Sequence, residues 1–486
     1  MWRTLPVCAL LLIPPLAVRA ADNPNEKVIR MTVQAMAAPK PTLKYQLLPE
    51  LHEMNPGNPI LGYTKCFAEQ HNFWRNKEVV EKREKWQKMP LKDLPLEELR
   101  KWEELRKSAH IRGKPPAKAT KQREIEDDVS ILSAHVRGYP LAYADEAARL
   151  DTPDWQILNQ FKHGGPLLPL PDLPQLRVLA GALKVRFRVE VAQRRFDDAL
   201  GTAKTVLALS RHLGEHPTFI GEVVGLAVGS LSIDPLDEMI GQAGCPNLFW
   251  ALSELPRPFI DLRKGVQGDR MMMTDLFALI DEQAPMSEAQ VQHAVDRIRR
   301  LVKDAHVISN VPNWLLALTT DEEHVRATRK RLIELGLAED KVKQFSAAQV
   351  ILLEEKLEFT VSRDESRKAM TLPYWQAAPI LSAVQPRKER PDAPLRWLQG
   401  IGYLKIKQAQ TRLDQRIALL RCVEALRIYA AEHAGKLPEK LDDIRLPLPV
   451  DPATGKPFSY KVDGKTAHLH GEPLTIQVRY EVTIGK

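Results

Sequence analysis

The apolar positions of the chain recur mostly three and four residues apart, which is the spacing of helices that bury one face. Over residues 172–240 this pattern predicts three consecutive helices, around which we expect the rest of the fold to be organised. The first should open on Asp172 and Pro174, because a carboxylate caps free N–H groups and proline lacks one. Its expected inner face is Leu176, Leu179, Ala180, Leu183, Phe187 and Val191.

The end of this first helix admits a second interpretation. From Leu183 to Val191 apolar and charged residues also alternate, as they do in a half-buried strand. We predict a helix, because no Gly, Pro or Asn interrupts residues 184–196 and a lone strand between helices would lack a partner.

The second and third helices follow without a long connection. The second is expected from Phe196 to a stop at Gly214. The third should begin at Thr218 and end before Asp234-Pro235, where a new cap and proline would restart the chain as residues 236–240.

The spacing of Phe196, Ala199 and Leu207 resembles the second helix of a tetratricopeptide-type hairpin, in which small residues let two helices nest. The first helix does not fit that consensus, and no second copy follows at a period of about 34 residues. A generic helical hairpin is therefore the prediction.

Helical periodicity continues over most of the remaining chain, whereas residues 21–40 read as polar and irregular. Further helices are predicted at 59–75, 77–88, 95–108, 119–137, 259–282, 288–304, 322–335, 347–370 and 395–428. The last fifty residues change character, because glycines separate short alternating runs that predict strands at 458–462, 466–469 and 474–484.

These elements predict a mainly α protein, an irregular helical bundle or partial solenoid with a tetratricopeptide-like hairpin. A small C-terminal α+β module, formed by a long helix and an antiparallel sheet, should complete it. The expected division is a signal peptide at 1–20, an N-terminal helical region at 21–165, a central helical domain at 166–390 and the C-terminal module at 391–486.

The first twenty residues have the pattern of a secretory signal peptide. Arg3 gives a positive start, residues 7–18 are apolar, and Val18-Arg19-Ala20 offers a small-residue cleavage site. No later apolar run reaches about 18 residues, so we expect an exported chain, periplasmic or extracellular, without an integral membrane span.

Charge changes this picture little. Removal of the signal takes away Arg3 and Arg19 and lowers the formal charge from +8 to +6. Lys, Arg and Glu are interleaved over residues 77–106, which is typical of solvated helix faces and argues against nucleic acid as a partner. The expected partner is a protein or a cell-envelope component.

Three cysteines remain after the signal: Cys66, Cys245 and Cys422. Their odd number and the lack of a CxxC pair favour buried thiols, with one bridge left open, over a zinc site or a disulfide scaffold. We predict neither a metal nor a cofactor.

Gly221, Gly225 and Gly229 form a stripe without side chains along the third helix. Such stripes bring helices together in membranes. Because Glu222 interrupts a short apolar run, we predict close packing against another helix of the same protein.

The letters His212-Leu-Gly-Glu215-His216 match an inverted zinc-protease motif. A zinc site needs both imidazoles on one face of a continuous helix, yet Gly214 and Pro217 place this segment at a helix end. We expect solvent-facing histidines there, and we identify no catalytic residue in the chain.

The segment 250–263 concentrates side chains that often anchor partners: Trp250, Arg257, Asp261 and Arg263. Arg257 and Asp261 lie four residues apart, so a local ion pair is the simpler interpretation. The alternative is a recognition groove, and these four residues are our candidate partner-binding site.

The C-terminal segment combines a long helix ending at Gly435, a Leu437-Pro438 loop and the turn Asp451-Pro452 through Gly455 to Pro457-Phe458. It resembles the globular part of a type II secretion pseudopilin. The resemblance covers about a sixth of the chain. Filament assembly is not implied, because an ordinary signal and nearly four hundred residues precede the similarity.

Over most of its length the chain also resembles a group of large, exported, mainly helical bacterial proteins without assigned function. The residues that carry this resemblance are 43–50, 56–58, 196–212, 247–263 and 429–460. It implies architecture and export but no activity. We therefore expect an exported interaction or scaffold protein, with a secreted hydrolase whose site is assembled from distant residues as the alternative.

Overall fold

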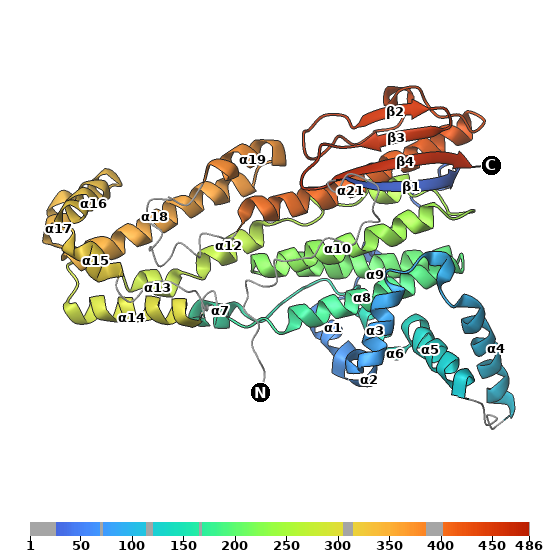
Figure 1. Ribbon diagram of the computed structural model, residues 1–486, viewed down its shortest axis with the longest axis horizontal. Coiled ribbons are helices and arrows are strands. Elements are labelled where there is room, and N and C mark those ends of the chain that lie inside the picture. Colours follow the sequence, from blue (N-terminus) through green and yellow to red (C-terminus); the bar gives the residue numbers. More distant parts are fainter. Residues whose placement is uncertain are drawn as a thin grey trace.

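The computed structural model describes residues 26–68, 71–112, 120–164, 168–304, 314–384 and 402–485, so the expected signal peptide lies outside the described residues. Figure 1 shows an elongated molecule, with a bundle and a small sheet at one end and an arm of helices at the other. The predicted mainly α fold with a small C-terminal α+β module is confirmed.

The elements follow in chain order. The N-terminal part contains β1 (Glu26–Gln34), α1 (Pro59–Ala68), α2 (His71–Arg75), α3 (Lys77–Trp86), α4 (Leu96–Arg112), α5 (Thr120–Arg137), α6 (Tyr139–Ala147) and α7 (Leu158–Gly164). The middle contains α8 (Asp172–Ala192), α9 (Phe196–Gly214), α10 (Phe219–Ile240), α11 (Phe249–Ser253), α12 (Arg263–Met271), α13 (Thr274–Ala278), α14 (Glu288–Asp304), α15 (Trp314–Thr320), α16 (Glu322–Glu334), α17 (Glu339–Gln344) and α18 (Ala347–Met370). The chain ends with α19 (Tyr374–Ala383), α21 (Tyr403–Glu432), β2 (Ser459–Asp463), β3 (Thr466–His470) and β4 (Gln477–Gly485).

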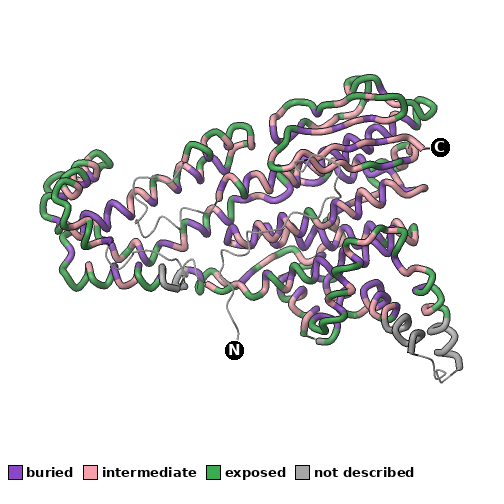
Figure 2. Tube along the Cα trace, viewed as in Figure 1, coloured by how far each residue is buried: buried purple, intermediate pink, exposed green. Residues whose placement is uncertain are grey.

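Helix α8 lies at the centre of the bundle and is buried on every side over residues 179–191, which Figure 2 shows as a continuous purple stretch. Its partners are α9 and α10 on one side and α3, α5 and α6 on the other. The helix prediction is therefore confirmed. Apolar and charged residues alternate in this stretch although it is helical. A helix that is enclosed on all sides has no solvent-facing side, so its charged residues are buried as well.

Each buried charge of α8 meets a polar partner on a neighbouring element. Arg186 donates two hydrogen bonds to Asp145 of α6, at 2.6 and 2.8 Å, and Arg188 donates to both carboxylate oxygens of Glu238 on α10. Glu190 accepts a 2.6 Å hydrogen bond from Thr202 of α9. These contacts offset the cost of taking charges out of water, so α8 is held by specific pairs and by apolar packing together.

Helix α10 continues through Pro235, so the predicted break at Asp234-Pro235 is wrong. A proline inside a helix costs about 3 kcal/mol because it removes a hydrogen bond and crowds the preceding turn. The residues that follow the proline are almost completely buried: Leu236, Met239 and Ile240 are each at most 1% exposed. Each such side chain contributes about 1.5–3 kcal/mol on burial, so packing outweighs the local penalty.

Two aspartates of this last part of α10 form a polar hub. Asp234 faces Lys27 of β1 at 3.2 Å, Lys184 of α8 at 3.3 Å and Arg416 of α21 at 3.6 Å. Asp237 accepts hydrogen bonds from Arg416, at 2.7 Å, and from the hydroxyl of Tyr480 on β4, at 2.8 Å. The hub therefore joins α10 to two other helices and to two strands.

The sheet contains a strand that the sequence pattern missed. Residues 26–34, within a segment expected to be irregular, form β1 and pair in parallel with β4 from Glu26 opposite Gln477 to Gln34 opposite Gly485. The strand order is β1-β4-β3-β2, so the sheet is mixed, whereas the three predicted C-terminal strands are antiparallel as expected. Parallel pairing between the two ends of the chain leaves no local turn signal for sequence analysis to detect.

The glycine stripe of α10 lies against α9, as predicted. A Cβ atom on Gly225 would come within 2.9 Å of the carbonyl oxygen of Ser210, and Ser210 donates a 2.7 Å hydrogen bond to the carbonyl of Gly225. Among the described residues α10 is the one helix long and apolar enough to cross a membrane by length and composition, and 67% of its most apolar window is buried inside the protein.

The predicted helix at 259–282 is also wrong, since α12 begins only at Arg263 and α13 follows as a separate short helix. The N–H of Phe259 donates to Asp414 of α21 and the side chain of Asp261 accepts from the N–H of Arg263. Residues 259–262 are therefore held against α21 as a connection, and the helix starts after Asp261.

Helices α13 to α18 form the arm, which has an apolar core of its own that includes Ile298, Trp314 and Leu353. Its long helix α18 is tied to the bundle at Asp269 of α12. This fully buried carboxylate accepts hydrogen bonds from Arg363 of α18 and from the hydroxyl of Tyr403 on α21. The domain limits expected at 165 and 390 stay predictions, and one apolar core already joins Met31 of β1 to Val482 of β4.

The glycine contact between α9 and α10 can be tested with two Gly→Ala variants. Gly225→Ala should lower the free energy of unfolding by about 1–3 kcal/mol, because the added methyl meets the backbone of α9. Gly201→Ala on α9 meets nothing within 4 Å and should raise it by about 0.5–1 kcal/mol. Urea denaturation followed by circular dichroism measures both; equal effects would contradict the close approach.

The buried pair of Arg188 and Glu238 generates a second expectation. Arg188→Met leaves Glu238 and two main-chain carbonyls without their donor and should cost about 2–4 kcal/mol in unfolding free energy. Arg177→Met, at an exposed position of the same helix, should change it by less than about 0.5 kcal/mol. A tolerated Arg188→Met would mean that α8 is held by apolar packing alone.

Candidate functional site

The segment 247–261, which contains most of the predicted partner-binding residues, lies antiparallel to α21 and is fixed to it by polar side chains. Glu424 accepts from the N–H of Leu248 at 3.1 Å, and Asp414 accepts from the N–H of Phe259 at 2.9 Å. Gln410 donates to the carbonyl of Ile260 at 2.7 Å. An irregular connection is thus held in one conformation along about four turns of helix.

The four predicted residues lie along this segment but do not form one groove. Trp250 is half-buried on α11, with its ring edge-on to Phe249 at 5.2 Å between centroids. Asp261 precedes the N-cap of α12, and its carboxylate accepts hydrogen bonds from the N–H of Arg263, at 3.0 Å, and from its Nε, at 2.6 Å. Arg257 is exposed and donates to the carbonyl of Ser253 at 2.9 Å. The expected pair of Arg257 with Asp261 is therefore replaced by a pair of Asp261 with Arg263, because the turn at residues 256–262 is not helical.

A further arginine, Arg421 of α21, lies beside Arg257. Its Nε donates to the hydroxyl of Ser253 at 3.0 Å and its Nη2 to the carbonyl of Pro447 at 3.2 Å. Its guanidinium also lies 5.7 Å from the centre of the Phe249 ring. Only 3% of Arg421 is exposed, yet among the described residues neither arginine forms an ion pair with a carboxylate.

The electrostatics of this region follow from that arrangement. Burial, followed by repulsion from Arg257, lowers the pKa of Arg421 to about 10. Asp414 is the carboxyl near Arg257, and burial raises its pKa to about 7 although its hydrogen bond from Phe259 and the charges of Lys407 and Arg257 act in the opposite direction. The two guanidinium groups beside Ser253 therefore repel each other, and neither is neutralised by an ion pair with a carboxylate of the described residues.

The histidines of the inverted zinc-protease motif are not solvent-facing, so that expectation is wrong. Nδ1 of His212 lies 2.9 Å from the hydroxyl of Tyr63, and Nδ1 of His216 lies 2.8 Å from that of Thr218. Burial lowers the two pKa values to about 4 and about 3, so both rings are neutral at pH 7. Glu215 pairs with Lys264 instead. At this helix end His212, Glu215 and His216 point toward different neighbours, so they pack between elements and do not converge on a metal.

Glu222, in the first turn of α10, is a fully buried carboxyl. Its Oε1 accepts a 2.6 Å hydrogen bond from the N–H of Gly265, whereas its Oε2 has no partner among the described residues. Burial raises its pKa to about 9, and the charges of Asp261 and Glu215 act in the same direction. The side chain is therefore protonated at neutral pH and lies where no solvent reaches it.

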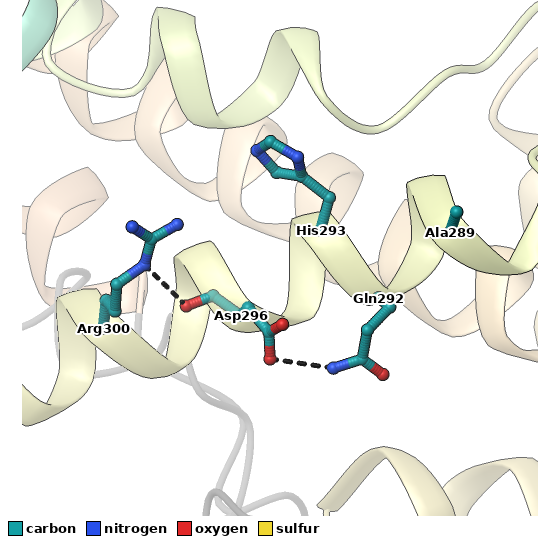
Figure 3. A pocket seen from close by; sticks show the side chains of 5 residues that line it. All are labelled: Ala289, Gln292, His293, Asp296 and Arg300. Atoms are coloured by element: carbon teal, nitrogen blue, oxygen red, sulfur yellow. Dashed lines mark hydrogen bonds between the residues drawn. The ribbon is translucent and has the colours of Figure 1, made fainter.

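A surface hollow on the arm has no comparable organisation. It is lined by five residues of α14, which Figure 3 shows along a single helix: Ala289, Gln292, His293, Asp296 and Arg300. Gln292 donates to Asp296 at 2.8 Å within the same helix. Since these lining residues all belong to one helix, no second element among the described residues converges on a ligand here.

Metal-ligating side chains do not gather elsewhere in the part of the chain that the structure describes. No group of three or more His, Cys, Asp and Glu residues converges there. Cys66, Cys245 and Cys422 are buried free thiols, as favoured from their number and spacing.

Comparisons with protein-family models, with curated proteins and with solved structures find no match to this chain. The site is therefore interpreted from its own geometry.

Sequence analysis selected residues 250–263 as the candidate site but did not include Arg421 of α21, which contacts this segment. Arg421 lies seven residues from Asp414 and fourteen from Lys407, a spacing that places all three on one face of α21. Polar residues repeated along one face of a long apolar helix were the available signal. That Asp414 and Arg421 contact Phe259 and Ser253 depends on packing between segments more than 150 residues apart in the sequence.

Glu222 gives the protein a pH dependence with a definite sign. Below about pH 4.5 the folded and unfolded chains both hold this proton, and above it only the folded chain does until about pH 9. The group therefore lowers the free energy of unfolding as pH rises, by up to about 1.4 kcal/mol per pH unit.

In Glu222→Gln no proton is released on unfolding, so stability should decline less between about pH 5 and about pH 8 than in the unmodified protein. Urea titrations at both pH values measure the difference. Glu254→Gln, at an exposed position, provides the control and should leave the decline unchanged. Parallel declines in all three proteins would show that Glu222 ionises freely in the folded state.

Proposed function

We propose that this chain is an exported interaction protein of the cell envelope or the extracellular space, and that it docks a protein partner on the outer side of residues 249–263. The observation that carries this proposal is the fixed mounting of the segment on α21, with Arg257 and Arg263 left facing outward.

Fixed backbone lowers the cost of binding, because less conformational freedom is lost when a partner arrives. Five hydrogen bonds join side chains or carbonyls of α21 to the segment, more than a simple connection between helices requires. Three of them hold Leu248, Phe259 and Ile260 through main-chain atoms. Tryptophan and arginine are also the side chains that most often carry binding energy at interfaces.

Export rests on the signal-peptide pattern of residues 1–20. The elongated shape supports a scaffold role, because the arm and the sheet lie at opposite ends of the molecule (Figure 1). The hydrolase alternative has less support among the described residues, since the raised-pKa carboxyls Glu222 and Asp414 each accept a main-chain N–H that fixes the fold.

Site-specific photo-crosslinking in the producing cells tests the docking surface. A photoreactive amino acid in place of Glu254, which is exposed next to Arg257, should give a discrete crosslinked product. The same amino acid in place of the exposed Arg177 of α8 should not give that product. Arg257→Ala combined with the reporter at Glu254 should abolish the product, because the proposed anchor is lost.

The thermal unfolding temperature of each variant shows that the fold is retained. Identical crosslinking from Glu254 and Arg177, or a product that survives Arg257→Ala, would remove the surface from consideration.

A further inference from the structure

We propose that Arg257 and Arg421 form a carboxylate-binding site that recognises an acidic polypeptide segment of the docking partner. This inference rests on the proposed function, because it specifies the chemistry of the partner at the same surface.

The two guanidinium groups meet at one residue. Arg421 approaches Ser253 from α21 and donates to its hydroxyl, while Arg257 approaches from the turn and donates to its carbonyl. Nη1 of Arg421 donates no hydrogen bond to any of the described residues. An exposed donor group and a nearly buried one are therefore placed side by side.

Four other buried arginines of this protein are matched by carboxylates, whereas Arg83 is bound by the neutral His135 and the carbonyl of Phe73. Arg186 faces Asp145, Arg188 faces Glu238, Arg363 faces Asp269 and Arg427 faces Glu424. Arg421 is 3% exposed, within the range of 0–7% found for these four, and lacks such a partner within the described residues. Unlike Arg83, it shares Ser253 with an exposed arginine, Arg257. A buried cation without a counter-ion is costly, so this position is suited to an anion supplied from outside.

The neighbouring acid does not fulfil this role. Asp414 uses Oδ1 to accept from the N–H of Phe259, and it forms no ion pair with either arginine. Its raised pKa, about 7, and the lowered pKa of Arg421 agree with a region in which positive charge is not neutralised. A carboxylate that contacts both guanidinium groups would accept charge-assisted hydrogen bonds in the fork geometry that arginine offers.

Apolar surface borders the two arginines, which favours a polypeptide over a small inorganic anion. Trp250 on α11 is half-buried, and so are Leu446 and Leu448, the neighbours in sequence of Pro447, whose carbonyl binds Arg421. Val450 beyond them is 49% exposed. Acidic residues interspersed with apolar ones would match this pattern of charge and hydrophobic surface.

Fluorescence anisotropy with the full mature chain tests the site directly. The probe is a labelled peptide of alternating glutamate and leucine, roughly ten residues long, and its glutamine–leucine counterpart is the uncharged comparison. We expect saturable binding of the glutamate peptide that weakens with added salt and at least about tenfold weaker binding of the glutamine peptide.

Arg257→Gln should weaken binding of the glutamate peptide by about tenfold or more, because the exposed donor is lost. Arg263→Gln is the matched control, since Arg263 is equally exposed but already paired with Asp261, and it should change the affinity by less than about threefold. Both variants remove a surface charge, so their thermal unfolding temperatures should match that of the parent.

Equal effects of Arg257→Gln and Arg263→Gln would mean general charge attraction and would overturn the site, as would the absence of binding or equal binding of the two peptides. Displacement of the peptide by inorganic phosphate at equimolar concentration would identify a phosphate site instead. If crosslinking from Glu254 succeeds while the peptide fails to bind, docking stands and its acidic chemistry is rejected.

Discussion

The aspartate hub of α10 is the interaction on which the architecture depends. Asp234 and Asp237 receive Lys27 from β1, Lys184 from α8, Arg416 from α21 and the hydroxyl of Tyr480 from β4. Burial alone would raise the pKa of Asp234, but Lys184, Lys27 and Arg416 together hold it well below its ordinary value. Elements from both ends of the chain thus meet at one turn of one helix, where a proline would otherwise be expected to end it.

The same use of buried polar side chains recurs along α8 and α21. Both helices are enclosed by other elements, so neither has an outer face on which polar residues could collect. Their charged side chains instead fix neighbours: Arg186 and Arg188 hold α6 and α10, and Asp414 and Glu424 hold the connection after α10. These hydrogen bonds fix the backbone of an irregular segment. A fixed backbone loses less conformational freedom when a partner binds, which favours the proposed docking surface.

Arg421 differs from this pattern, because it is buried like the paired arginines and yet donates only to Ser253 and to the carbonyl of Pro447. Arg83 also lacks a carboxylate, but its Nε donates to His135. The arm is joined to the bundle through a complete version of the same arrangement, with Arg363 and Tyr403 on the carboxylate of Asp269. Comparing the two shows what Arg421 lacks among the described residues, namely a carboxylate in an ion pair with its guanidinium group. The functional proposals follow from that difference within one molecule.

The sequence by itself determined the helices, because their periodicity is local: the extents of α8, α9, α14 and α18, the three C-terminal strands and the tight contact at Gly225 are all readable from residue types. It also singled out the segment of Trp250 and Arg257, whose role in partner binding is proposed. Only the tertiary structure decided that α10 runs through Pro235, that β1 joins β4, and that His212 and His216 are enclosed. Each of these outcomes depends on partners far away in the chain, whose packing outweighs local preference, and so does the placement of Arg421 beside Arg257.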